Sequence, residues 1–221
     1  MMSGRIVYVV GLLLSISSPA LAQQEEPVGP FAADIRGIFA RHKQEPSVAT
    51  DLGVQPLNLP TRSVGLTAGA HWYPWHAGVV TFGLGGHVLT GRGSQTLEPT
   101  TQPPTTLGST PTVNPTVLRH FRAIATDVSF NFGHRNGWSY ISGGIGRSRL
   151  FVERKDQPVT SPPGRQTIHY GAGARWFTNH HLAVSLDLRW YAVAPQTASA
   201  TGGVAQPRTT LLVLSGGIAL R

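Results

Sequence analysis

Strict alternation of apolar with polar or small side chains is the feature that most limits how this chain can fold. Residues 182–191 read LAVSLDLRWY. Successive side chains of a β-strand point to opposite faces, so Leu186, Leu188 and Trp190 share one face. Asp187 and Arg189 share the other face. A water-soluble sandwich would turn the apolar face toward its core, whereas a membrane barrel would turn it toward lipid and enclose the charged pair. The alternation alone leaves both folds open.

The same strand-like pattern recurs along the chain. The predicted strands cover 31–42, 61–73, 78–93, 117–134, 138–154, 167–177, 182–191 and 209–221. A tilted transmembrane β-strand needs about 9–11 residues, so these segments are long enough to cross a bilayer. The 26 glycines and the low share of charged residues (13%) also favour strands over helices.

The connections between these segments alternate in length. Proline-rich long loops are predicted at 42–60, 94–116, 155–166 and 194–208, because proline cannot complete a strand ladder. Short turns are predicted at 74–77, at 178–181 and at Asn136-Gly137, a pair that type I′ hairpins favour. Short periplasmic turns, long extracellular loops and an even strand number are typical of bacterial outer-membrane barrels. The prediction is all-β: an eight-stranded antiparallel up-and-down transmembrane β-barrel over residues 31–221.

The first residues have the pattern of an export signal. Arg5 precedes an apolar run at 6–16, and Ala20-Leu21-Ala22 follows as a cleavage site. The run is shorter than the roughly 20 residues that a membrane-spanning helix needs. We therefore predict a cleaved signal peptide at 1–22, a polar periplasmic leader at 23–30, and a location in the bacterial outer membrane.

The overall composition limits the possible partners. The chain has no cysteine, so neither disulfides nor thiolate metal sites hold it together, and no metal or cofactor is expected. The net charge of +8 and the pI of about 10.8 would ordinarily suggest nucleic acid. Export makes that partner unexpected. Anionic outer-membrane lipid and glycolipid are the predicted partners of the positive charge.

Signal peptide, alternating strands, glycine-rich hairpins and the run at 184–191 together resemble the OmpA/OmpX-type family of small outer-membrane β-barrels, within the porin-like superfamily. The resemblance is architectural and covers nearly all of the mature chain. It implies a monomer that depends on periplasmic chaperones and on the barrel-insertion machinery during biogenesis.

A barrel of eight strands has an interior narrow enough for side chains to fill. The alternation assigns two histidines, His71 and His87, to inward faces of neighbouring strands, where they are expected to be hydrogen-bonded lumen residues. It assigns six charged residues to the lumen: Asp34, Arg36, Asp127, Arg175, Asp187 and Arg189. Buried charges are tolerated only when they are paired. One interpretation is an ion-pair plug that stabilises the barrel, and the other is a narrow ion-conducting pore gated by one of these pairs.

Aromatic and arginine residues gather at opposite ends of the predicted strands. An interfacial aromatic belt is predicted near the short turns, formed by Trp72, Trp75, Trp138, Tyr140 and Trp176. A rim of arginines is predicted toward the long loops: Arg62, Arg92, Arg119, Arg122, Arg147, Arg149, Arg154 and Arg165. The rim is either simply solvated or binds phosphates of the outer-leaflet glycolipid, for which the guanidinium fork is well suited.

Motifs of hydrolytic enzymes are not found. The sequence contains no Gly-x-Ser-x-Gly and no His-Glu-x-x-His. We therefore expect a non-enzymatic outer-membrane protein of structural or surface-interaction type. The alternatives are a narrow porin-like channel and a soluble lipocalin-like barrel that binds an apolar ligand.

Overall fold

A computed structural model describes residues 30–97, 116–134, 137–155, 162–179, 181–196 and 207–221. The predicted signal peptide (1–22) and most of the predicted leader (23–30) lie outside the described residues, as does the Asn136 half of the predicted Asn-Gly turn. In the part of the chain that is described, no helix is long and apolar enough to span a membrane.

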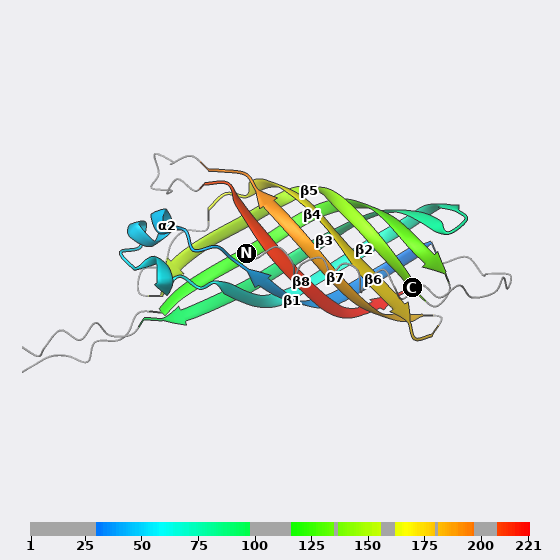
Figure 1. The fold of residues 1–221 in the computed structure, drawn as a ribbon, viewed down its shortest axis with the longest axis horizontal. Helices are drawn as coiled ribbons and strands as arrows, with labels where there is room; N and C mark the ends of the chain where they lie inside the picture. Colours follow the sequence, from blue (N-terminus) through cyan, green and yellow to red (C-terminus); the bar gives the residue numbers. More distant parts are fainter. Residues whose placement is uncertain (1–29, 98–115, 135–136, 156–161, 180, 197–206) are drawn as a thin grey trace, which may run out of the picture.

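The described chain forms one closed antiparallel β-barrel (Figure 1). Each strand pairs with its neighbour in sequence, and β8 pairs with β1 to close the sheet. This is the predicted fold. The strands are β1 (Phe31–Arg41), β2 (Arg62–Ala77), β3 (Val80–Thr96), β4 (Thr116–His134), β5 (Gly137–Arg154), β6 (Arg165–Phe177), β7 (Leu182–Val193) and β8 (Thr209–Leu220).

Long and short connections alternate along this barrel as predicted, with one correction to a turn. Residues 74–77 were expected to be a tight turn, but β2 continues to Ala77 and the chain reverses at Gly78, where φ is +59°. The pairing of β2 with β3 shifts between Trp72 and Trp75. This irregularity accommodates Pro74, because a bulge is one of the few places where a strand tolerates proline.

The first long connection is partly helical, which corrects the predicted loop at 42–60. It contains the helix α2 (Pro46–Asp51) and the 3-10 turn η1 (Pro56–Asn58). Pro46 sits in the first helical turn, where proline is well tolerated. Three apolar residues of this segment, Val48, Ala49 and Leu59, form a buried cluster with Val117 near the start of β4. The segment is therefore a folded cap at the long-loop end of the barrel (Figure 1).

The alternation places the large apolar side chains on the outside of the barrel. Ile35, Ile124 and Ile145, near the middle of their strands, are 60%, 62% and 61% exposed. Aromatic side chains extend this apolar surface at the short-turn end, where Trp75 and Phe130 are also exposed. A continuous apolar belt of this kind is uncommon on proteins that face water and marks a surface that contacts membrane or partner.

The inside of the barrel is filled in three layers. Near the short turns, Ala32, Tyr73, Trp138 and Tyr140 form an aromatic cluster. Charged side chains occupy the middle. Toward the long loops lies an apolar cluster of Ile38, Ala40, Leu89, Phe121, Ala123, Leu150, Tyr191, Val193, Leu211 and Val213. The alternation had predicted a mainly polar lumen, so this apolar layer is a finding of the structure.

The exposed belt makes a direct prediction for the outer surface. Ile35 lies midway between the exposed Phe31 and Phe39 on β1, so replacing it with Arg is expected to destabilise the barrel in lipid bilayers by about 2–4 kcal/mol, the cost of Arg at the bilayer midplane. The same change at Leu57, which is 70% exposed in η1, is the control and should change stability by less than about 0.5 kcal/mol. Urea unfolding of the barrel in vesicles measures both. Equal effects of the two substitutions would contradict a lipid-facing belt.

Candidate functional site

The candidate site is the charged middle layer of the lumen. Four strands supply it, because inward positions of β1, β4, β6 and β7 lie at similar depth once the sheet closes. None of its six charged residues is more than 4% exposed, so the charges must be neutralised by one another: Asp34, Arg36, Asp127, Arg175, Asp187 and Arg189.

Asp34 binds two guanidinium groups. Its Oδ1 lies 3.0 Å from Arg36 Nε, two residues along the same strand. Its Oδ2 lies 2.8 Å from Arg175 Nη2, which reaches across the lumen from β6. These charge-assisted hydrogen bonds join β1 to β6, which are not neighbours in the sheet.

Arg189 is the centre of the second part of the network. Its Nη1 donates to Asp127 Oδ2 at 2.9 Å, and its Nη2 donates to Asp187 Oδ2 at 3.2 Å. Ser142 Oγ accepts a further hydrogen bond from Nη2 at 3.1 Å. Arg36 Nη1 lies 3.5 Å from Asp187 Oδ2 and links the two parts. Three carboxylates therefore balance three guanidinium groups in one connected cluster.

The two predicted lumen histidines both border Asp127. His71 lies between two carboxylates, with Nε2 at 3.5 Å from Asp34 and Nδ1 at 3.7 Å from Asp127. Both distances are too long for good hydrogen bonds, and His71 Nε2 has no hydrogen-bond partner among the described residues, so the expected hydrogen bond of this atom is not formed. His87 Nδ1 is 3.6 Å from Asp127, and its Nε2 is 2.8 Å from the Tyr191 hydroxyl. A Cβ at Gly85 would overlap the His71 ring, so the glycine provides the space for this contact.

Sequence reasoning missed several members of the network. Tyr140 donates to Asp187 Oδ2 at 2.9 Å, and Arg175 donates to the Tyr73 hydroxyl. His169 is fully buried; its Nε2 donates to the Thr126 carbonyl at 3.0 Å, which leaves Nδ1 as an acceptor 3.3 Å from Arg189. Parity was the available signal, because these residues occupy the inward positions of their strands.

The predicted aromatic belt needs correction at two positions. Trp72, Trp75 and Trp176 point outward and are 47%, 57% and 40% exposed. Trp138 and Tyr140 instead point into the lumen and are 4% and 5% exposed. The register of β5 explains the difference, because Ser139 and Ile141 occupy the outward positions beside them.

The arginines of the predicted rim also fall on both faces of the sheet, some pointing inward and others outward. Arg119 and Arg165 are buried rather than solvated. Arg119 Nη1 donates to the Lys43 carbonyl at 3.2 Å, and Arg165 Nη1 donates to the Ala194 carbonyl at 3.1 Å. These hydrogen bonds attach the segments that follow β1 and β7 to the long-loop end of the barrel. Arg154 is partly buried and donates to the Leu52 carbonyl, whereas the remaining members point outward: Arg62, Arg92, Arg122, Arg147 and Arg149.

A buried serine–histidine pair lies beneath the cap, and its geometry does not suit nucleophilic catalysis. His42 Nε2 is 2.8 Å from Ser63 Oγ. Burial, together with the neighbouring Arg119 charge, lowers the pKa of His42 to about 3, which makes it a weak base. His42 Nδ1 has no hydrogen-bond partner among the described residues, so nothing orients the ring as a triad would. Among those residues, no group of three or more potential metal ligands is placed to hold an ion.

Comparisons with known proteins agree with the architecture. No protein-family model matches the sequence, and no curated protein matches it. Among solved structures, Neisserial surface protein A is 10% identical with a TM-score of 0.51, over 88% of this chain and 99% of that chain. Ail, the attachment invasion locus protein of Yersinia pestis solved with the heparin analogue sucrose octasulfate, is 11% identical with a TM-score of 0.48, covering 86% and 99%. Outer membrane protein AlkL, solved in lipid bilayers, is 14% identical with a TM-score of 0.43, covering 92% and 94%. The similarity to Neisserial surface protein A shows that this chain has the fold of a small eight-stranded outer-membrane barrel.

Removing the central guanidinium tests the charge balance. Arg189→Met leaves Asp127 and Asp187 without their shortest ion pair and is expected to cost about 3–5 kcal/mol of stability. Arg208→Met is the control because Arg208 is exposed, and it should change stability by less than about 0.5 kcal/mol. Denaturant unfolding gives both values. A neutral Arg189→Met variant would show that the carboxylates do not depend on this partner.

His42 makes the cap sensitive to acid. The folded state keeps His42 neutral down to about pH 3, whereas in the unfolded chain the residue has its ordinary pKa of 6.5. The stabilising effect of the neutral ring is therefore full above pH 6.5 and is lost as the pH falls toward 3. Hydrogen exchange at the Leu52 and Val54 amides, corrected for intrinsic rates, should show protection that decreases over this range. His42→Gln should remove the decrease; an equal pH dependence in that variant would contradict the assignment.

Proposed function

We propose that this chain is a bacterial outer-membrane barrel of structural or surface-interaction type, whose lumen is closed by its ion-pair network. The observation that carries the proposal is the inverted distribution of side chains: charges inside, apolar residues outside. Burying three carboxylates and three guanidinium groups is unfavourable unless each finds partners, and the lumen provides them. The apolar exterior is stabilised where lipid excludes water from it.

The two ends of the barrel fit opposite sides of an outer membrane. Short turns and exposed tryptophans lie at one end, which we assign to the periplasm. Pro30 and Arg221 lie at this same end, since the Pro30 carbonyl accepts from the Tyr73 amide and the Arg221 amide donates to the His181 carbonyl. The cap formed by α2 and the long connections lie at the other end, which we assign to the cell surface (Figure 1). Contacts with other molecules are therefore proposed to occur through these long connections.

The narrow-channel alternative requires a hydrated path through the lumen. Network residues in the middle layer are nearly inaccessible to water, and the apolar layer above them contains Phe121, Tyr191 and Leu211 at 2% exposure or less. An ion on this path would lose its hydration without a replacement. These observations support a closed barrel over a conducting one.

The soluble lipocalin-like alternative requires the opposite arrangement, with an apolar lumen and a polar exterior. Asp187 and Arg189 would then face water, but both are 3% exposed inside the barrel. Ile124, which would line the ligand cavity, is 62% exposed on the outside. The distribution of side chains therefore favours the membrane barrel.

Three measurements test the proposal. The outer-membrane fraction should contain a protein whose intact mass corresponds to a chain starting at Gln23 and whose gel migration changes on heating. Proteinase K added to intact cells should cut the segment between β3 and β4. The purified protein should give no conductance steps in planar bilayers at several salts and voltages. Discrete steps would support the channel instead, and recovery from the periplasm without detergent would contradict the membrane location.

A further inference from the structure

Outward-facing arginines form a continuous arc at the loop end of five neighbouring strands. Arg41 and Arg62 are directly opposite each other in the β1–β2 pair, and Arg122 and Arg149 are directly opposite in the β4–β5 pair. Arg92 on β3 lies one diagonal step from both pairs. We call the set the arginine arc; its members are Arg41, Arg62, Arg92, Arg122, Arg147 and Arg149, all exposed.

The arc has no internal compensation for its charge. Like charges directly opposite on neighbouring strands destabilise a sheet. Within the described part of the chain, none of the six guanidinium groups lies within 4.0 Å of a carboxylate oxygen. Glu153, the acidic residue beside the arc, is already engaged 3.0 Å from His120. Each lumen arginine is neutralised by a carboxylate of this chain, whereas the arginines of the arc are not.

Three members of the arc converge most closely. Arg122 and Arg149 face each other across the β4–β5 ladder, and Arg147 lies two residues from Arg149 on the same face. The side chains of Arg147 and Arg149 both lie near Gly164, since a Cβ placed there would be 3.6 Å from the Arg147 Cβ and 3.9 Å from the Arg149 Nε. Cross-strand neighbours on one face are about 5 Å apart at Cβ, so the three guanidinium groups can reach one phosphate.

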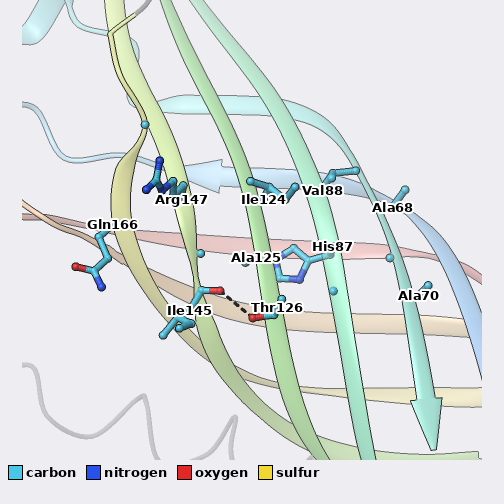
Figure 2. Close-up of a pocket in the computed structure, with 14 residues that line it drawn as sticks. Ala68, Ala70, His87, Val88, Ile124, Ala125, Thr126, Ile145, Arg147 and Gln166 are labelled. Carbon is cyan, nitrogen blue, oxygen red and sulfur yellow. Dashed lines mark hydrogen bonds between the residues drawn. The ribbon is translucent and has the colours of Figure 1, made fainter.

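A shallow apolar groove on the outer surface is lined at one edge by Arg147, one of these three arginines (Figure 2). Its volume is about 1130 Å³, comparable with ordinary ligand pockets of about 300–1,000 Å³. Small outward residues on β2 and β3, Ala68, Ala70 and Gly86, create the depression, and Ile124 and Ile145 border it. Arg147 and Gln166 stand at one edge of the groove, and Ala68 and Ala70 at the opposite edge (Figure 2).

We propose that the groove and the Arg122/Arg147/Arg149 cluster form a binding site for the phosphorylated glycolipid of the outer leaflet. The guanidinium groups bind a phosphate of its headgroup, and the groove holds one acyl chain against the barrel wall. This rests on the proposed function, because the site faces lipid only if the barrel is in the outer membrane.

Charge and position together select this ligand. A phosphate is dianionic or monoanionic and matches the guanidinium fork, which a zwitterionic headgroup satisfies less well. The cluster lies at the loop end of the belt, at the cell-surface side in the proposed orientation, where the outer leaflet carries its headgroups. The groove adjoins the cluster from the apolar belt, so one amphiphile can occupy both. A soluble polyanion would use the arginines but leave the groove empty.

The test measures lipid binding to the purified full-length barrel by native mass spectrometry in detergent. The probes are bisphosphorylated lipid A, its fully dephosphorylated form and phosphatidylglycerol. We expect the unchanged protein to bind bisphosphorylated lipid A about tenfold more tightly than either of the others. Arg122→Gln/Arg147→Gln/Arg149→Gln should remove this preference. Replacing the same three arginines with Lys should retain part of it, because the charge remains while the fork is lost.

Matched controls separate the site from general charge and from general hydrophobicity. Lys43→Gln/Lys155→Gln/Arg208→Gln removes the same charge elsewhere and should leave the preference unchanged. Ala68→Leu/Ala70→Leu fills the groove and should weaken both forms of lipid A equally, whereas Ala33→Leu/Ala172→Leu, at other outward positions, should not. Heat-dependent gel migration verifies that each variant is folded.

The outcomes distinguish this inference from the proposed function. Unchanged binding by the Gln triple variant, an equal loss in the charge control, or equally tight binding of phosphatidylglycerol would overturn the glycolipid site. Unchanged binding by the groove-filling variant would overturn the acyl-chain part. In each case a folded barrel that inserts into membranes leaves the proposed function intact.

Discussion

Arg189 holds together the part of the molecule that is hardest to stabilise, the buried carboxylates. Its guanidinium group contacts Asp127 and Asp187 at 2.9 and 3.2 Å and also contacts Ser142. A planar group with five donors suits this position, because a lysine could not bind two carboxylates and a hydroxyl in one plane. The same group contacts the Nδ1 atoms of His87 and His169, which accept only while those rings are neutral. One side chain thus fixes the charge balance and the tautomers around it.

This interior explains why the exterior must be apolar. The interior of an eight-stranded barrel is narrow enough for side chains to fill, so the inward side chains of all the strands meet in the lumen. The charged side chains neutralise one another in the middle layer, and the large apolar side chains of the belt remain on the outside, where the lipid of a membrane would cover them. The buried network does not have to contribute more stability than an apolar lumen would. It does specify one register, because a one-residue slip of β7 would move Asp187 and Arg189 to the outer surface.

Alternation predicts the strands, and the export signal together with the alternating connection lengths predicts that the charged face is the lumen face. Each strand has a single inward parity, and this parity correctly predicts that Asp34 and Arg36 on β1 face the inside. On β5 the parity puts Trp138 and Tyr140 inside, whereas their position near the short turn had suggested the membrane interface. Three-dimensional partners were beyond sequence reasoning, since Asp34 and Arg175 meet across the lumen from strands that do not pair. The sequence does not predict the cap, because its helix has only six residues and lies in a segment rich in proline. The helix is stabilised by packing on Val117 rather than by intrinsic helix propensity.

The central claim is that inward and outward faces are inverted relative to a water-soluble barrel. The absence of cysteine allows single spin labels to be placed along β7 at Val184, Ser185 and Leu186 in turn. Electron paramagnetic resonance of the barrel in bilayers then compares collision with oxygen, which concentrates in lipid, and with a water-soluble nickel complex. The account predicts high oxygen accessibility at 184 and 186 and low accessibility to both reagents at 185. High nickel accessibility at 184 and 186 would contradict it.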